Sequence, residues 1–182
     1  IDLVMEAPAR FTTLVAKALE AEMPFLQPAV FRSRFHFAEE IPTRDLVQIL
    51  IRIAKRGSNG VLLKAPDTPE VTQAIAQLSD AKIPVVTLVT DIPNSRRFSY
   101  VGIDNRAAGA TAAYLMGQWL GDSPAQILVT LSSNQFRGEE EREIGFRRAL
   151  RETYPHLTTV EISEGFGRDR TTGTLVREVL EK

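Results

Sequence analysis

Polar and aromatic side chains recur just after the strands that the sequence predicts. The carboxyl ends of parallel strands meet at one edge of a sheet, which is where open α/β sheets bind ligands. Aromatic rings cover the apolar face of a sugar, while carboxylates, an amide and guanidinium groups hydrogen-bond its hydroxyls, so this set suits a neutral polyhydroxyl ligand. The candidate ligand-binding residues are Arg10, Phe11, Asp91, Asp104, Asn105, Arg142 and Phe166.

Each candidate also has a purely structural interpretation, and the residues alone leave both open. Asp104 or Asn105 fits the role of a plain helix N-cap as well as it fits that of a ligand contact. Arg142 has Glu139 within reach on its own predicted helix, and Asp91 opens the turn in DIPNS. The aromatic candidates also suit core positions. Only their joint placement after strands favours a ligand site.

The sequence lacks the motifs of common enzyme classes, so we predict no catalytic residue, no metal and no cofactor. It contains no phosphate-binding G-x-x-x-x-G-K-[ST] loop and no G-x-S-x-G nucleophile motif. The stretch GFGRDR begins like a dinucleotide fingerprint, but Arg170 stands where the third glycine belongs. With no cysteine and only two histidines, His36 and His156, neither a thiol nucleophile nor a cysteine or paired-histidine metal site can be built.

Composition is that of a globular domain with a sizeable core. The 182 residues are 43% hydrophobic and 25% charged, with a net charge of −1. This balance argues against a large nucleic-acid-binding surface within these residues. No apolar run approaches the roughly 18 residues of a membrane span, and no secretory leader opens the chain.

Strand and helix patterns alternate along the whole chain, which predicts an α/β fold with parallel sheets covered by helices on both faces. Thr43 and Thr68 are predicted N-caps, and Gly57 is a predicted helix end. The predicted strands are 1–5, 30–37, 60–66, 83–91, 99–103, 126–132 and 158–163. The predicted helices are 11–23, 43–57, 68–82, 105–120, 139–154 and 171–181.

A cluster of Gly, Asp, Ser and Pro at Gly121–Ala125 is the best internal boundary. We therefore predict a first lobe over residues 1–121 and a second, incomplete lobe over residues 122–182. The opening IDLVME begins directly as a strand, which suggests a fragment of a longer protein.

Four stretches resemble the type I periplasmic-binding-protein fold: IPVVTL, YVGIDN, AAGATAAYL and EEEREIGFRRAL. Ribose-type sugar-binding proteins share this fold with the effector domains of LacI (lactose repressor) family transcription regulators. The order and spacing of the stretches fit nearly the whole chain. DIPNSRR and YVGIDNRAAG look closer to the regulators than to the transport proteins.

The resemblance implies roles for individual residues. Asp104 and Asn105 match a sugar-contacting Asp-Asn pair at the start of a helix. Arg142 matches the arginine of R-x-x-G-[FW], which reaches ligand hydroxyls or a ring oxygen, and Phe166 matches an aromatic that stacks on the ligand.

The sequence departs from the family at two other positions. Arg10 replaces one aromatic of a pair whose second member is Phe11. Asp91 lies one step beyond the polar pair of sugar transporters, which falls at Val89 and Thr90. These departures leave the identity of the sugar open, including a different or charged effector.

The implied function is that of a ligand-sensing domain of a LacI-type regulator, which binds a sugar-like effector in an interlobe cleft. Such a protein would be a cytoplasmic homodimer that reaches DNA through a helix-turn-helix before Ile1. A periplasmic sugar-binding protein of an ABC transporter is the alternative. An α/β enzyme acting on a sugar or nucleotide is a third hypothesis.

Overall fold

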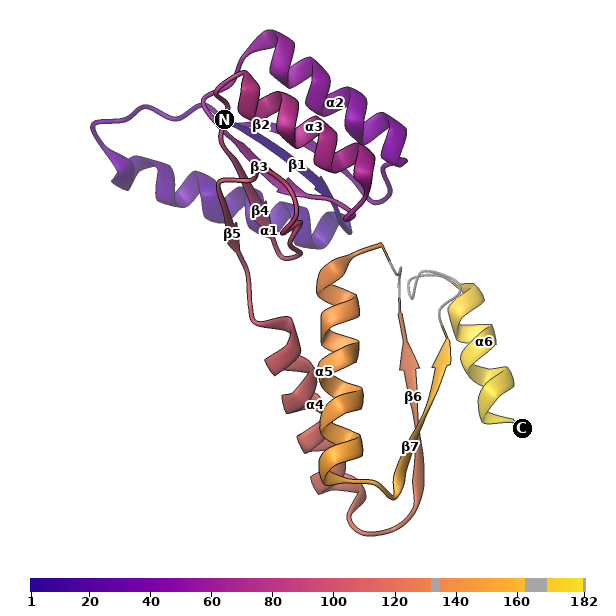
Figure 1. Cartoon of the computed structure of the whole chain (residues 1–182). Helices are drawn as coiled ribbons and strands as arrows, with labels where there is room; N and C mark the ends of the chain where they lie inside the picture. The colour runs from indigo at the N-terminus through magenta and orange to yellow at the C-terminus, as the bar shows by residue number, and fades with distance from the viewer. Residues whose placement is uncertain (132–134, 163–169, 182) are drawn as a thin grey trace. The chain divides into compact units, whose positions relative to one another are not determined.

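Two compact units make up the chain, Ile1–Gly102 and Ile103–Lys182, called unit 1 and unit 2 below. The structure, a computed structural model, describes residues 1–131, 135–162 and 170–181. Helices and strands alternate in both units except that one strand, at Ser99–Val101, follows the strand Val85–Leu88 without a helix between them, and all pairings among the described strands are parallel. The predicted α/β fold with parallel sheets and covering helices is confirmed (Figure 1).

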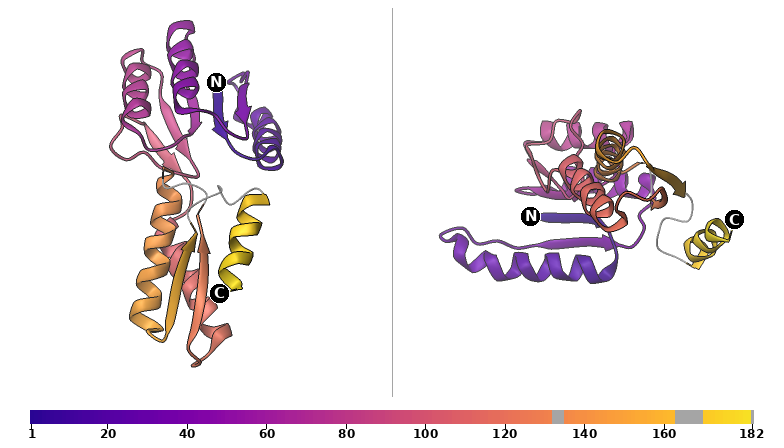
Figure 2. Two further views of the ribbon diagram at one scale, coloured as in Figure 1. Left: turned by 90° about the vertical axis from the view of Figure 1, so that its right-hand side faces the viewer. Right: turned by 90° about the horizontal axis from the view of Figure 1, so that it is seen from below.

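Unit 1 is a five-stranded sheet in the order β2-β1-β3-β4-β5. Helices α2 and α3 cover one face of this sheet, and α1 lies on the other face (Figures 1 and 2). Its elements are β1 (Asp2–Glu6), α1 (Ala9–Glu22), the 3₁₀ helix η1 (Met23–Leu26), β2 (Arg34–Ala38), α2 (Thr43–Arg56), β3 (Val61–Lys64), α3 (Pro69–Asp80), β4 (Val85–Leu88) and β5 (Ser99–Val101).

The main core of unit 1 lies between the sheet and the pair α2–α3. Both helices place apolar residues at intervals of three and four, which forms one buried stripe on each. Burial of this stripe supplies the main driving force for docking the helices. The fully buried side chains here include Val4, Leu46, Leu50, Ile53, Leu63, Val71, Ile75 and Leu78.

A buried carboxylate ties β1 to its neighbours. The side chain of Asp2 is fully buried and accepts hydrogen bonds from Arg34 Nη2 (2.8 Å) and Arg56 Nη2 (2.6 Å). His36 Nε2 lies 2.9 Å from the same carboxylate. Burial raises the pKa of Asp2, but the hydrogen bonds from Arg34, His36, Ser58 and Arg56 outweigh it and hold the pKa well below its usual range. The network fixes the register of β1 against β2, in which Asp2 lies opposite Arg34.

Unit 2 has a two-stranded parallel sheet of β6 and β7 among its described residues. Helices α4 and α5 pack on each other, and α6 lies on the other side of the strands (Figures 1 and 2). Ala113, Ile127, Leu150 and Leu157 form its core. The elements are α4 (Asn105–Leu120), β6 (Ala125–Thr130), α5 (Arg137–Thr153), β7 (Leu157–Ile162) and α6 (Arg170–Leu180).

The division between the units differs from the predicted lobe boundary. It falls at Gly102, whereas the sequence pointed to Gly121. The Gly121–Ala125 cluster does form the connection from α4 to β6, with Gly121 at a φ of 65°. Helix α4 nevertheless belongs to unit 2, because it packs along α5 and contributes Ala113 to that core.

Helix ends follow local sequence signals at most of the predicted places. The Thr68 hydroxyl accepts from the Val71 amide (3.4 Å) at the start of α3, and Gly57 ends α2 with a φ of 90°. The predicted N-cap Thr43 is wrong. Pro42 occupies the N-cap position, and α2 begins at Thr43. The proline ring fixes φ near the −51° that Pro42 adopts here, so proline fits this position. No side chain caps the start of this helix.

Candidate ligand-binding site

The start of α4 holds the Asp104-Asn105 pair. Asp104 caps the helix, since its Oδ1 accepts from the Ala107 amide at 3.0 Å. The next residue, Asn105, is only 3% exposed, so its amide group needs hydrogen-bond partners inside the protein. The Nδ2 group donates to the Ile103 carbonyl at 3.5 Å. The capping interpretation of Asp104 is therefore confirmed, and Asn105 is a buried polar group beside the cap.

Arg142 on α5 reaches Asn105 rather than a carboxylate of its own helix. Its Nη2 donates to Asn105 Oδ1 at 2.6 Å, although 37 residues separate the two in sequence. Other arginines of α5 behave differently: Arg137 pairs with Glu141 and Arg148 with Glu152, one turn along the helix. The hydrogen bond to Asn105 uses one of five guanidinium N–H donors. Arg142 is itself solvent-exposed, so further donors are accessible at this place.

Two glycines bring α4 and α5 close enough for that hydrogen bond. A Cβ atom on Gly109 would lie 1.9 Å from the Arg142 carbonyl oxygen, and one on Gly145 would lie 2.1 Å from the Arg106 carbonyl oxygen. The two backbones are thus in direct contact at two points within about one helical turn of the Asn105–Arg142 pair. Because only glycine lacks a Cβ, these two positions set the distance between the helices.

In unit 1, two candidates lie in the first turn of α1, after the end of β1. Arg10 is exposed and Phe11 is 38% exposed, so both side chains are accessible. The sequence analysis missed Lys64, which ends β3 in the central part of the same sheet. Its Nζ donates to the Glu6 carbonyl oxygen at 2.6 Å. A single charge in the otherwise apolar GVLLKAP was the signal that could have found it.

Asp91, after β4, is held by partners within unit 1. Its Oδ1 accepts from Thr87 Oγ1 and from the Ile92 amide, each at 2.8 Å, and its Oδ2 accepts from Arg97 Nη2 at 2.6 Å. Burial raises the pKa of Asp91, but the hydrogen bonds from Arg97 and Thr87 outweigh it and hold the pKa below its usual value. The side chain thus closes the turn in DIPNS, and this structural role accounts for its contacts.

The residue that follows β4 adopts a strained backbone conformation. Val89 has a φ of 69°, which is rare for a β-branched residue. The Thr90 amide donates to the Leu88 carbonyl at 2.7 Å, which makes a three-residue turn centred on Val89. The Tyr100 hydroxyl donates to the Val89 carbonyl at 3.2 Å and helps to hold the turn. Such strain persists only where neighbouring contacts impose it, and strained residues often cluster at functional sites.

The structure thus brings Asp104, Asn105 and Arg142 together within unit 2, and Arg10 and Phe11 together within unit 1. Phe166 lies outside the described residues. The amide and guanidinium can hydrogen-bond hydroxyl or ring oxygens. Residues 1–131, 135–162 and 170–181 contain no cluster of three or more side chains suited to a metal ion.

Comparison with known families identifies the class of protein. The family described as "Periplasmic binding protein domain" matches residues 33–181. The chain belongs to this family. No curated protein sequence matches the chain.

Solved structures show the same fold. A glucose-galactose binding protein, GanP, from Geobacillus stearothermophilus is 25% identical, with a TM-score of 0.86 over 99% of this chain and 63% of GanP. The sugar-binding protein of a sugar ABC transporter from Bacillus halodurans is 24% identical, with a TM-score of 0.83 over 99% of this chain and 60% of that protein. A solute-binding protein of an ABC transporter from Agrobacterium vitis, solved with D-fucose, is 24% identical, with a TM-score of 0.84 over 99% and 62%. The chain thus spans less than two thirds of each of these proteins.

The predicted cytoplasmic location is wrong. The chain belongs to a periplasmic-binding-protein family, and the similar solved structures include sugar-binding proteins of ABC transporters, which fits a periplasmic location instead. Among the described helices, none is long and apolar enough to cross a membrane.

Proposed function

We propose that this chain is the sugar-binding portion of a solute-binding protein that serves an ABC transporter. The hydrogen-bonded pair of Asn105 and Arg142 carries the proposal, because it presents a buried amide and an exposed guanidinium at the start of a helix. Family membership and the similarity to a glucose-galactose binding protein support a monosaccharide as the ligand. The protein would bind its ligand without transforming it.

Three more residues enter the proposal as ligand contacts of unit 1. Phe11 would cover the apolar face of the sugar, and Arg10 and Lys64 would add donors to hydroxyl groups. Asp91 is left out, since Arg97, Thr87 and Ile92 already use its carboxylate oxygens. Phe166 stays a proposed stacking residue on the strength of the family resemblance.

Calorimetric titration with D-glucose, D-galactose, D-fucose and D-arabinose tests the proposal. In unfolding curves measured with sugar at a hundredfold excess over Kd, the free energy of unfolding should be about 2.7 kcal/mol higher than without sugar. Arg142→Ala should abolish this gain and leave the fold intact. Arg148→Ala is the matched control, since Arg148 lies on the same helix and pairs with Glu152 at the surface. Normal sugar binding by Arg142→Ala would refute the site.

A second candidate function is ligand sensing in a LacI-type transcription regulator. The observation that favours it is the pair of stretches DIPNSRR and YVGIDNRAAG, which resemble the regulators more than the transport proteins. The two functions share the fold and the ligand chemistry. Sequencing about 60 codons of the native gene upstream of Ile1 separates them, because a helix-turn-helix would support a regulator and a signal peptide would support the transport protein.

A further inference from the structure

The loop between α2 and β3 contains the pair Asn59-Gly60. Asn59 is exposed and lies at a bend of the chain, and no other asparagine of the sequence is followed by glycine. The backbone nitrogen of the residue after an asparagine can attack the side-chain carbonyl carbon and displace ammonia. Glycine hinders this attack least, because it has no Cβ and its backbone adopts more conformations than that of any other residue. The pair therefore has the residue types for loss of the side-chain amide.

The Gly60 nitrogen, which is the attacking atom in this reaction, is weakly held. Its N–H donates to Ser58 Oγ at 3.4 Å, whereas N–H···O hydrogen bonds normally span about 2.7 to 3.2 Å. The Gly60 carbonyl is held more firmly, since it accepts from the Asp2 amide at 3.0 Å and from Ser58 Oγ at 2.9 Å. The nitrogen is thus the less constrained end of this residue.

The other described asparagines lack this combination. Asn94 is exposed, but the amide that follows it, of Ser95, donates to the Ile92 carbonyl at 3.1 Å. Asn105 is buried, and its Oδ1 accepts from Arg142. Among the asparagines that the structure describes, exposure, a following glycine and a weakly bound amide occur together only at Asn59.

We propose that Asn59 is a site of spontaneous deamidation. The Gly60 nitrogen bonds to Cγ of Asn59, the Cγ–Nδ2 bond breaks, and ammonia leaves with the proton of the Gly60 amide. Water then opens the resulting succinimide ring at either of its carbonyl carbons, which leaves aspartate or isoaspartate at position 59. Water is the only co-reactant. The inference does not depend on the sugar-binding proposal.

The modified loop supports the start of β1. The Gly57 carbonyl accepts from Arg34 Nη2 at 3.5 Å, and the Gly60 carbonyl accepts from the Asp2 amide, so the loop touches the Asp2 network on both sides of Asn59. Isoaspartate carries the main chain through Cβ and Cγ, which inserts one extra atom just before Gly60. Strand β3 follows at once and pairs with both β1 and β4. Isoaspartate should therefore destabilise unit 1 more than aspartate, which leaves the backbone unaltered.

Peptide mapping of the 182-residue chain, after incubation at mildly alkaline pH and physiological temperature, tests the site. Trypsin releases residues 57–64 as one peptide, in which Asn59 is the sole asparagine. This peptide should convert into two products that share one mass and each carry an added negative charge. The tryptic peptides that contain Asn94 and Asn105 are internal controls and should stay unchanged.

Gly60→Ala is the matched variant. A Cβ at this position would lie 3.7 Å from its nearest neighbour, the Pro84 carbonyl oxygen, which is an ordinary contact, so the fold should be kept. The added methyl group hinders attack by the nitrogen of residue 60, and most of the conversion should be lost over the same incubation. Equal conversion in wild type and Gly60→Ala, or conversion of Asn59 only after unfolding in urea, would overturn the proposal.

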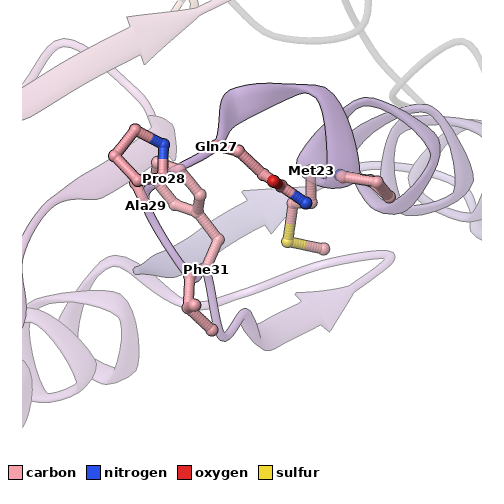
Figure 3. Close-up of a pocket in the computed structure, with 7 residues that line it drawn as sticks. Met23, Gln27, Pro28, Ala29 and Phe31 are labelled. Carbon is pink, nitrogen blue, oxygen red and sulfur yellow. The ribbon is translucent and has the colours of Figure 1, made fainter.

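Oxidation of methionine must be kept apart from deamidation when stability is measured. Met23 lines a pocket of about 520 Å³ together with Gln27 and Phe31, which makes it accessible to peroxide (Figure 3). Oxidation adds an oxygen atom but no charge, so ion-exchange chromatography separates it from deamidation. The acidic fraction of the aged chain, which contains both products, should have a lower urea midpoint than Asn59→Asp. A midpoint equal to that of Asn59→Asp would refute the effect on β1 and β3.

Discussion

Replacement of Gly109 by alanine should separate α4 from α5 and break the Asn105–Arg142 hydrogen bond. The new Cβ would lie 1.9 Å from the Arg142 carbonyl oxygen, whereas ordinary contact begins at 3.4 Å, so the helices must open by about 1.5 Å at this point. The atom that is struck belongs to the backbone of α5, so no side-chain rotation relieves the clash. An opening of that size takes the 2.6 Å hydrogen bond beyond hydrogen-bonding distance.

The energetic effect has two opposing parts. Overpacking of a tight contact costs about 3 kcal/mol, while alanine in place of glycine inside a helix gains about 1 kcal/mol. The net loss in the free energy of unfolding should be about 2 kcal/mol. Sugar affinity should also fall about tenfold, because Arg142 moves away from Asn105.

Urea unfolding followed by far-UV circular dichroism measures the stability, and the fluorescence of Trp119, the single tryptophan, reports on α4. Gly173→Ala is the matched control. It is also a glycine inside a helix, but an added Cβ would meet nothing within 4 Å, so this change should raise stability by about 0.5 to 1 kcal/mol. Equal effects of the two substitutions would refute the argument that α4 and α5 depend on close backbone contact.

Two further predictions concern unit 1. Lys82 follows the C-cap of α3 with a φ of 61°, in a turn where its amide donates to the Ser79 carbonyl and the next amide donates to the Leu78 carbonyl. Lys82→Gly should therefore raise the urea midpoint by an amount worth about 0.5 to 1 kcal/mol, and a lowered midpoint would contradict this. Asp2→Asn should lower stability at pH 7 by about 2 to 4 kcal/mol, since it removes the charge that Arg34 and Arg56 surround. Because the folded protein holds the pKa of Asp2 below its ordinary value of 3.8, the contribution of this carboxylate is present above that value and is lost as the pH falls through the folded pKa. Unfolding curves at pH 7 and pH 3 should thus show a smaller difference between wild type and Asp2→Asn at the lower pH, and an unchanged difference would argue against the network.

Local signals made most of the fold predictable. Thr68 with Pro69 and the Asp104 cap each act within one helical turn, so short stretches of sequence reveal them. The segment 30–37 shows the limit of such reasoning, because alternation continues from Val30 whereas β2 begins at Arg34. The strand starts where β1 supplies a partner, opposite Asp2, and that condition is not local.

The candidate site was predictable only in part for the same reason. Glu139 was a reasonable partner for Arg142, because residues one turn apart on a helix are neighbours. The actual partner, Asn105, depends on the approach of α4 to α5 through Gly109 and Gly145, which no spacing within either helix reveals. Asp91 followed its local pattern instead, and its turn-forming role was already visible in DIPNS.

The direction of the Asn105–Arg142 hydrogen bond has a consequence for ligand selection. The guanidinium fixes the amide oxygen of Asn105 toward itself, and the Asn105 side chain is buried, so the exposed polar groups at this place are those of Arg142. Arg142 offers only N–H groups and a permanent positive charge. A hydroxyl can rotate to present its lone pairs to such a surface, but an ammonium group has none to present. At the proposed site, amino sugars with their charged nitrogen at this position should therefore be rejected, whereas the corresponding hydroxyl sugars should bind.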